Sequence, residues 1–148
     1  MRSNGRRVAA VLAAVAAVGL LAGCSSGSGP RGPVQEYSGG PEEIDEEFLL
    51  PGEPQAFYVS DGAGIAVVLW GSSSCPPVAD RMVVDAPKRE GNTVSVTVRE
   101  DFDGPCTLDL APHTSVFVTP TDIATFEPLT ILVGNAEIVI LDSVLEPE

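Results

Sequence analysis

The sequence is poor in basic residues, in histidine and in aromatic side chains. Its 148 residues contain eight Lys and Arg against 21 Asp and Glu, one histidine, and 5% aromatic residues. Proteins bind nucleic-acid phosphates through Lys and Arg, so the formal net charge of −13 excludes nucleic acid as a partner. With one histidine the chain cannot supply the ligand set of a zinc site, and we expect neither a metal ion nor a cofactor.

Long apolar runs are absent except near the amino terminus, where the chain has the three parts of a secretory signal peptide. Arg2, Arg6 and Arg7 give a positive start, residues 8–21 are apolar, and small residues precede Cys24. The apolar part is shorter than the roughly 20 residues that a membrane-spanning helix requires. We therefore predict a signal peptide over 1–23; an uncleaved signal anchor is the alternative, and the export route stays open.

The end of this leader, Leu21-Ala22-Gly23-Cys24, resembles the lipobox of bacterial lipoproteins. The resemblance implies that the Cys24 thiol receives a diacylglyceryl group and that a peptidase then cuts before Cys24. Two acyl chains anchor a protein stably, whereas one chain binds membranes only reversibly. The mature protein is therefore expected on the extracytoplasmic face of the cell membrane, attached to the membrane through the lipid on Cys24.

Composition divides the mature chain into a tether and a domain. Residues 24–52 are first rich in Ser, Gly and Pro and then acidic, which predicts a flexible tether. Residues 53–148 contain short apolar or alternating segments with turn residues at intervals of about 8–12 residues, which is typical of an all-β sandwich or small barrel. We predict a small antiparallel β-sandwich, immunoglobulin-like or similar, with one disulfide.

The expected strands differ in the strength of their signals. Residues 64–71 are continuously apolar, as in a strand buried on both faces or a central strand of a sandwich, and residues 92–100 alternate apolar and polar side chains. Gly134-Asn135 is a plausible hairpin turn. The full set of expected strands is 56–60, 64–71, 81–86, 92–100, 106–110, 114–119, 129–134 and 136–142.

Cys75 and Cys106 remain as an even pair once Cys24 carries lipid. In an oxidising compartment two such cysteines most simply form a disulfide, and their spacing is not the C-x-x-C of a redox pair. A redox role stays as the alternative. Closing a loop of this length stabilises a fold by roughly 3–4 kcal/mol in the chain-entropy treatment.

Two further motifs surround these cysteines. Residues 70–77 read W-G-S-S-S-C-P-P and residues 106–112 read C-T-L-D-L-A-P. Together they resemble a family of uncharacterised actinobacterial lipoproteins and secreted proteins, with a W-G-S-S-S-C-P element followed by a C-T-x-D-L-x-P element. The resemblance covers roughly residues 56–120. It supports the disulfide and the extracytoplasmic location, and it implies no catalytic residue.

These motifs also contain the candidate functional residues. A serine nucleophile would depend on Asp109 and His113, but the G-x-S-x-G pattern of a nucleophile elbow is missing, so we predict no enzyme activity and no catalytic residue. Residues 101–104 resemble the start of a calcium loop without its later ligands, so we predict a solvated turn there. The candidate binding surface consists of Trp70, Ser72, Ser73, Ser74, Asp109 and His113.

The sequence leaves three functional hypotheses. The first is a membrane-anchored module that binds an envelope protein or polymer. The second is a passive structural component of the envelope, and the third, which has the least support, is a hydrolase. An exposed apolar patch favours the first hypothesis, because soluble monomers rarely expose a large apolar area without a binding role.

Overall fold

The computed structural model describes residues 29–100, 102–135 and 137–142. The expected signal peptide and the lipidation site Cys24 lie outside the described residues. The described elements are β1 (Gln35–Ser38), the short 3-10 helix η1 (Glu46–Phe48), β2 (Gln55–Val59), β3 (Gly64–Gly71), β4 (Val78–Ala86), β5 (Thr93–Arg99), β6 (Ala111–Val118), β7 (Leu129–Val133) and β8 (Glu137–Leu141).

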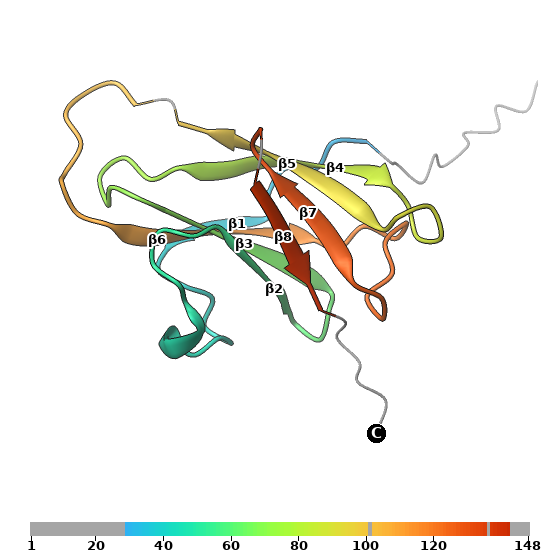
Figure 1. Ribbon diagram of the computed structural model, residues 1–148. Helices are drawn as coiled ribbons and strands as arrows, with labels where there is room; N and C mark the ends of the chain where they lie inside the picture. Colours follow the sequence, from blue (N-terminus) through green and yellow to red (C-terminus); the bar gives the residue numbers. More distant parts are fainter. Residues whose placement is uncertain (1–28, 101, 136, 143–148) are drawn as a thin grey trace, which may run out of the picture.

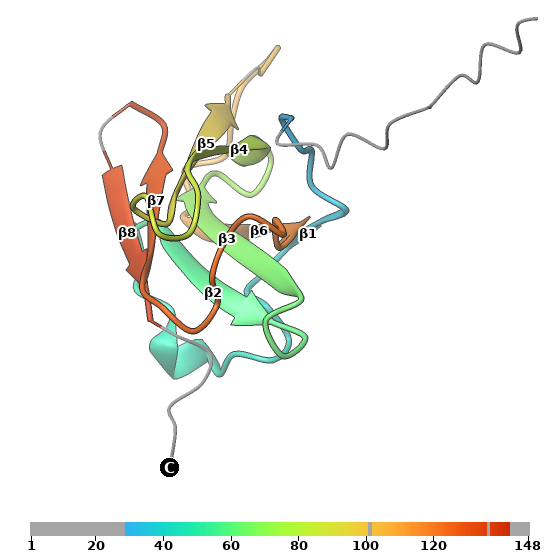
Figure 2. The ribbon, with the colours of Figure 1, turned by 90° about the vertical axis from the view of Figure 1, so that its right-hand side faces the viewer.

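The strands form two four-stranded sheets that face each other (Figures 1 and 2). One sheet has the order β1-β6-β3-β2 and the other has the order β4-β5-β7-β8. The predicted all-β sandwich is therefore confirmed. Every strand pair is antiparallel except β5 with β7, which run parallel. This order differs from that of an immunoglobulin domain, whose sheets are antiparallel and combine different strands.

The core lies between the sheets, and the alternation of side chains along each strand builds it. Along β3, Ile65, Val67 and Leu69 are buried in the core. Their neighbours in β3 face the opposite side, and Ala66 packs there in a second cluster to which Tyr37 of β1 contributes. The prediction that this strand is buried on both faces is confirmed, because β1 brings an aromatic side chain to its outer side.

The strand that alternates most regularly in sequence behaves as expected. Val94 and Val96 of β5 are buried in the core, with Val98 packed against it. The polar residues between them are part-buried or exposed on the other face of the sheet. The predicted hairpin between β7 and β8 is also confirmed, and Gly134 takes a positive φ of 61°, which glycine adopts without steric cost.

The structure differs from the expected tether over 24–52. Arg31 forms a two-way backbone bridge with Met82 of β4, with both N–H to O distances at 2.8 Å. The next residues form β1, which pairs with β6 at the edge of its sheet. This strand is short and mostly exposed, so it lacks the alternating apolar side chains by which strands are recognised. From Arg31 onward the segment belongs to the domain.

The segment 106–110 was expected as a strand and is instead part of a loop between β5 and β6. All of its side chains are exposed. Its alternation of leucine with polar residues resembles a half-buried strand, but no sheet edge lies alongside it. The following strand starts at Ala111, earlier than expected, and includes Pro112, whose carbonyl accepts the Gly39 amide at 2.9 Å.

Candidate functional site

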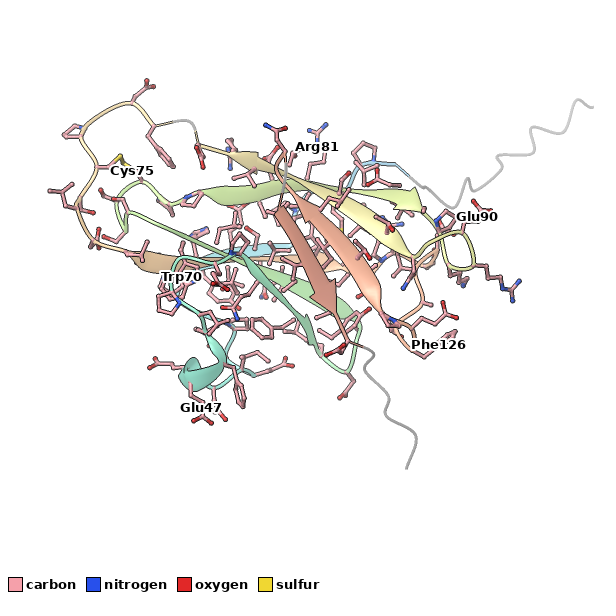
Figure 3. The ribbon with its side chains drawn as sticks, in the orientation of Figure 1. Glu47, Trp70, Cys75, Arg81, Glu90 and Phe126 are labelled. Atoms are coloured by element: carbon pink, nitrogen blue, oxygen red, sulfur yellow. A yellow bond between two sulfur atoms is a disulfide. The ribbon has the colours of Figure 1, made fainter. Side chains whose placement is uncertain are left out.

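Two connections that cross between the sheets meet at one end of the sandwich. Residues 72–77 lead from β3 to β4, and residues 100–110 lead from β5 back to β6. The disulfide Cys75–Cys106 joins them, with 5.5 Å between the two Cα atoms. Figure 3 places Cys75 in this region, far from Glu90 in the turn between β4 and β5. We call residues 72–77 and 102–110 the disulfide end.

A cluster of hydroxyl groups reinforces the disulfide. Thr107 Oγ1 lies 2.8 Å from the Ser72 hydroxyl and 3.2 Å from the hydroxyls of both Ser73 and Ser74. The Thr107 amide donates to Ser74 Oγ at 2.9 Å. These hydrogen bonds join the two connections. Side chains therefore hold residues 106–110 in place, where a strand would have been held by backbone pairing.

Asp109 completes this cluster. Its carboxylate accepts the Ser73 backbone N–H at 3.1 Å and the Thr107 hydroxyl. Hydrogen bonds from the side chains of Ser73 and Thr107, and then from the Ser73 backbone, lower the pKa of Asp109 to about 2, because each of them stabilises the charged form. The carboxylate is therefore ionised at any physiological pH, and it acts as a fixed acceptor between the two connections.

The same loop exposes large apolar side chains. Leu108 is fully exposed, Leu110 is 57% exposed and Phe102 is 39% exposed. This loop is held by the disulfide and by the Thr107 and Asp109 bonds, and its apolar side chains lie in solvent. The result is an ordered loop that presents apolar groups outward.

His113 lies apart from this cluster. It pairs in register with Leu69 of β3 and Ser38 of β1, so its ring shares the core side of the sheet with Leu69. Both ring nitrogens are buried without a hydrogen-bond partner among the described residues. Burial lowers the pKa of His113, and Glu36 acts in the opposite direction with a smaller effect. Asp109 is bonded to Ser73 and Thr107 instead, so serine, histidine and aspartate do not assemble into a triad.

Trp70 lies at the end of β3 and lines a cleft of about 540 Å³. The cleft lies between the end of β3 and the ends of β5 and β7 in the opposite sheet, and we call it the Trp70 cleft. Its lining residues are Gly52, Pro54, Leu69, Trp70, Pro77, Val98, Glu100, Val133, Gly134 and Asn135. Close packing shapes one wall, because a Cβ on Gly71 would clash with Pro77 Cδ. Glycine at 71 therefore lets the proline lie directly against the strand.

The cleft and the loop are neighbours. A Cβ placed on Gly52 would lie 4.0 Å from Leu110 Cδ2, and Gly52 itself lines the cleft. The exposed loop leucine therefore lies beside the cleft. The disulfide end and the Trp70 cleft form one continuous region of the surface.

The described ranges contain no group of three or more His, Cys, Asp or Glu side chains that could hold a metal ion. Nor does any helix in them have the length and apolar character needed to cross a membrane. Comparison with protein-family models, with curated proteins and with solved structures finds no match to this chain.

The fold brings together some of the candidate binding residues but not all of them. Of the six, the structure brings together Ser72, Ser73, Ser74 and Asp109 and sets Trp70 beside them in the cleft. His113 is not part of the group. Thr107, Leu108 and Leu110 were not among the six candidates, and the segment 106–110 that holds them was expected to be a strand.

Proposed function

We propose that this protein is a lipid-anchored module on the extracytoplasmic face of the cell membrane that binds an envelope protein through its disulfide end. The observation that carries the proposal is the exposure of Leu108, Leu110 and Phe102 on a loop fixed by a disulfide and by hydrogen bonds. Exposed apolar groups that are rimmed by polar residues mark interaction surfaces.

Rigidity makes this loop suitable for binding. A flexible loop loses conformational entropy when a partner orders it, and that loss weakens the complex. Here the covalent link and the bonds from Thr107 and Asp109 order the loop before any partner arrives. Burial of Leu108 and Leu110 against a partner would also remove apolar area from water, which favours association.

The position of the anchor supports the same function. The first described residues leave the domain on the side opposite to the loop 102–110 in Figure 1. Arg31, which is fixed to β4, lies seven positions after Cys24, so a lipid on Cys24 holds the domain within about 25 Å of the membrane even when that segment is fully extended. An anchor on that side leaves the disulfide end free to face away from the lipid surface and toward envelope partners.

The lipid anchor and the location rest on the residues around Cys24. The test of this part is metabolic labelling with an alkyne fatty acid in a bacterium that makes lipoproteins. We expect label on the tagged full-length protein and none on the Cys24→Ala variant. Equal labelling of both proteins, or no label on either, contradicts lipidation at Cys24.

The binding function is tested by cross-linking in living cells followed by capture through a carboxy-terminal tag. We expect one reproducible partner with the wild-type protein and its loss in the Leu108→Ser/Leu110→Ser double variant. The matched control is Phe126→Ser, because Phe126 is 62% exposed but lies away from Cys75 in Figure 3. Capture that the loop variant and the control reduce equally, or no partner at all, contradicts the proposal and leaves a passive structural role.

A further inference from the structure

The Trp70 cleft is a second feature of the disulfide end that the proposed function does not use. Its volume of about 540 Å³ lies within the roughly 300–1,000 Å³ of typical ligand sites. That size accommodates one long side chain together with parts of its neighbours. The cleft opens next to Leu110, so a partner that contacts the loop reaches the cleft as well.

The lining of the cleft is apolar with an acidic edge. Leu69, Trp70 and Pro77 from one sheet and its connection line it together with Val98 and Val133 from the other. Glu100, which is exposed just after β5, lines the same cleft. Apolar walls with a carboxylate at their edge fit a cationic side chain with an apolar stem, because the walls bury the stem and the carboxylate pairs with the charged group.

The charge around the cleft points the same way. Besides Glu100, this end carries Glu53, Asp103 and Asp109, and the lowered pKa of Asp109 keeps its carboxylate ionised at physiological pH. Arg99, the basic residue next to Glu100, lies 3.7 Å from Asp80. A second copy of this chain would bring the same excess of acidic groups, with 21 Asp and Glu against eight Lys and Arg. The partner is therefore a basic one and not a second copy.

We propose that the Trp70 cleft binds an arginine or lysine side chain from an apolar–basic–apolar peptide segment of the partner protein. The stem of that side chain packs against the apolar walls of the cleft, and its charged group pairs with Glu100. This inference rests on the proposed function, since it names the chemistry of the partner that the loop engages. Binding through the cleft can nevertheless be measured without the partner.

The test uses the purified full-length protein and a library of capped pentapeptides. The four outer positions are Leu, Val or Pro, and the central position is arginine, lysine, citrulline or glutamate. Trp70 is the chain's single tryptophan, so its fluorescence reports on the cleft alone. We expect arginine and lysine peptides to change this fluorescence in a saturable way, and citrulline and glutamate peptides to bind at least about fivefold more weakly.

Two variants test whether the peptides bind in the Trp70 cleft. Glu100→Gln keeps the shape of the side chain and should weaken the arginine peptides by about fivefold while leaving the citrulline peptides unchanged. Glu90→Gln removes a charge at the opposite end of the domain and should change nothing. Equal binding of arginine and glutamate peptides, no saturable binding at all, or no effect of Glu100→Gln overturns the inference. If the loop-dependent partner is still captured in cells after such a result, the cleft proposal alone fails; if capture also fails, the proposed function falls too.

Discussion

Removing the disulfide should destabilise the domain more than any single hydrogen bond at the same end. The bond closes a separation of 31 residues, so the chain-entropy treatment gives a stabilisation of roughly 3–4 kcal/mol. For a domain of this size, 1 kcal/mol corresponds to about 4 °C in melting temperature, so the double variant Cys75→Ala/Cys106→Ala should melt about 12–16 °C lower. The loss is expected because the bond ties together two of the connections that cross between the sheets.

Denaturant unfolding monitored by circular dichroism measures this difference, and limited proteolysis gives a second readout. The loop 102–110 belongs to no strand or helix, so a protease should cut it when the bond is absent and spare it when the bond is present. Reduction of the wild-type protein provides the control, because it breaks the bond without replacing the buried Cys75. A loss below about 1 kcal/mol in both the variant and the reduced protein would refute the reasoning.

Three further predictions concern single positions. In a carbon-13 titration of the side-chain carboxyl, the pKa of Asp109 should be about 2 in the wild type and should rise toward its ordinary value of 3.8 in Thr107→Val. Since the folded pKa is below the unfolded one, this carboxylate stabilises the fold above the unfolded pKa, and its contribution is lost as the pH falls through the folded pKa. An unchanged pKa in Thr107→Val contradicts the assignment. Asn92→Ala should cost about 2–4 kcal/mol in chemical unfolding, because Asn92 is 4% exposed, bonds to the 124–128 segment through both side-chain polar atoms and has a φ of 44°; a cost below about 1 kcal/mol contradicts this. Gly71→Ala should cost about 1–3 kcal/mol through its clash with Pro77, and Pro77→Ala in the same chain should recover part of that loss; an unchanged melting temperature in Gly71→Ala contradicts the contact.

The fold was largely predictable because apolar patterning marks buried strands. The continuous apolar run of β3 and the alternating pattern of β5 predicted the ends of both strands to within one residue, and the Gly134-Asn135 turn located the last hairpin. Two features were not predicted, for opposite reasons. β1 is stabilised by backbone pairing with β6 and lacks an apolar pattern, whereas 106–110 has the pattern of a strand but no pairing edge.

The site was only partly predictable, because sequence proximity does not determine which face a side chain occupies. Ser72 to Ser74 and Asp109 were expected together, and the disulfide brings them together. His113 lies four residues after Asp109 but already belongs to β6, where strand alternation turns it to the core side. The parallel pairing of β5 with β7 could not be predicted from the sequence either, since strand order depends on the tertiary arrangement of the whole chain.

The most direct test of the account is site-specific photo-cross-linking in living cells. A photoreactive amino acid replaces Leu108 in the lipid-anchored protein, and a second protein carries it in place of Phe126 at the far side of the domain. The account predicts one discrete cross-linked partner from position 108, none of it from position 126, and loss of the adduct in Cys24→Ala. The same adduct from both positions, or none from position 108, would contradict a membrane-anchored module that binds through its disulfide end.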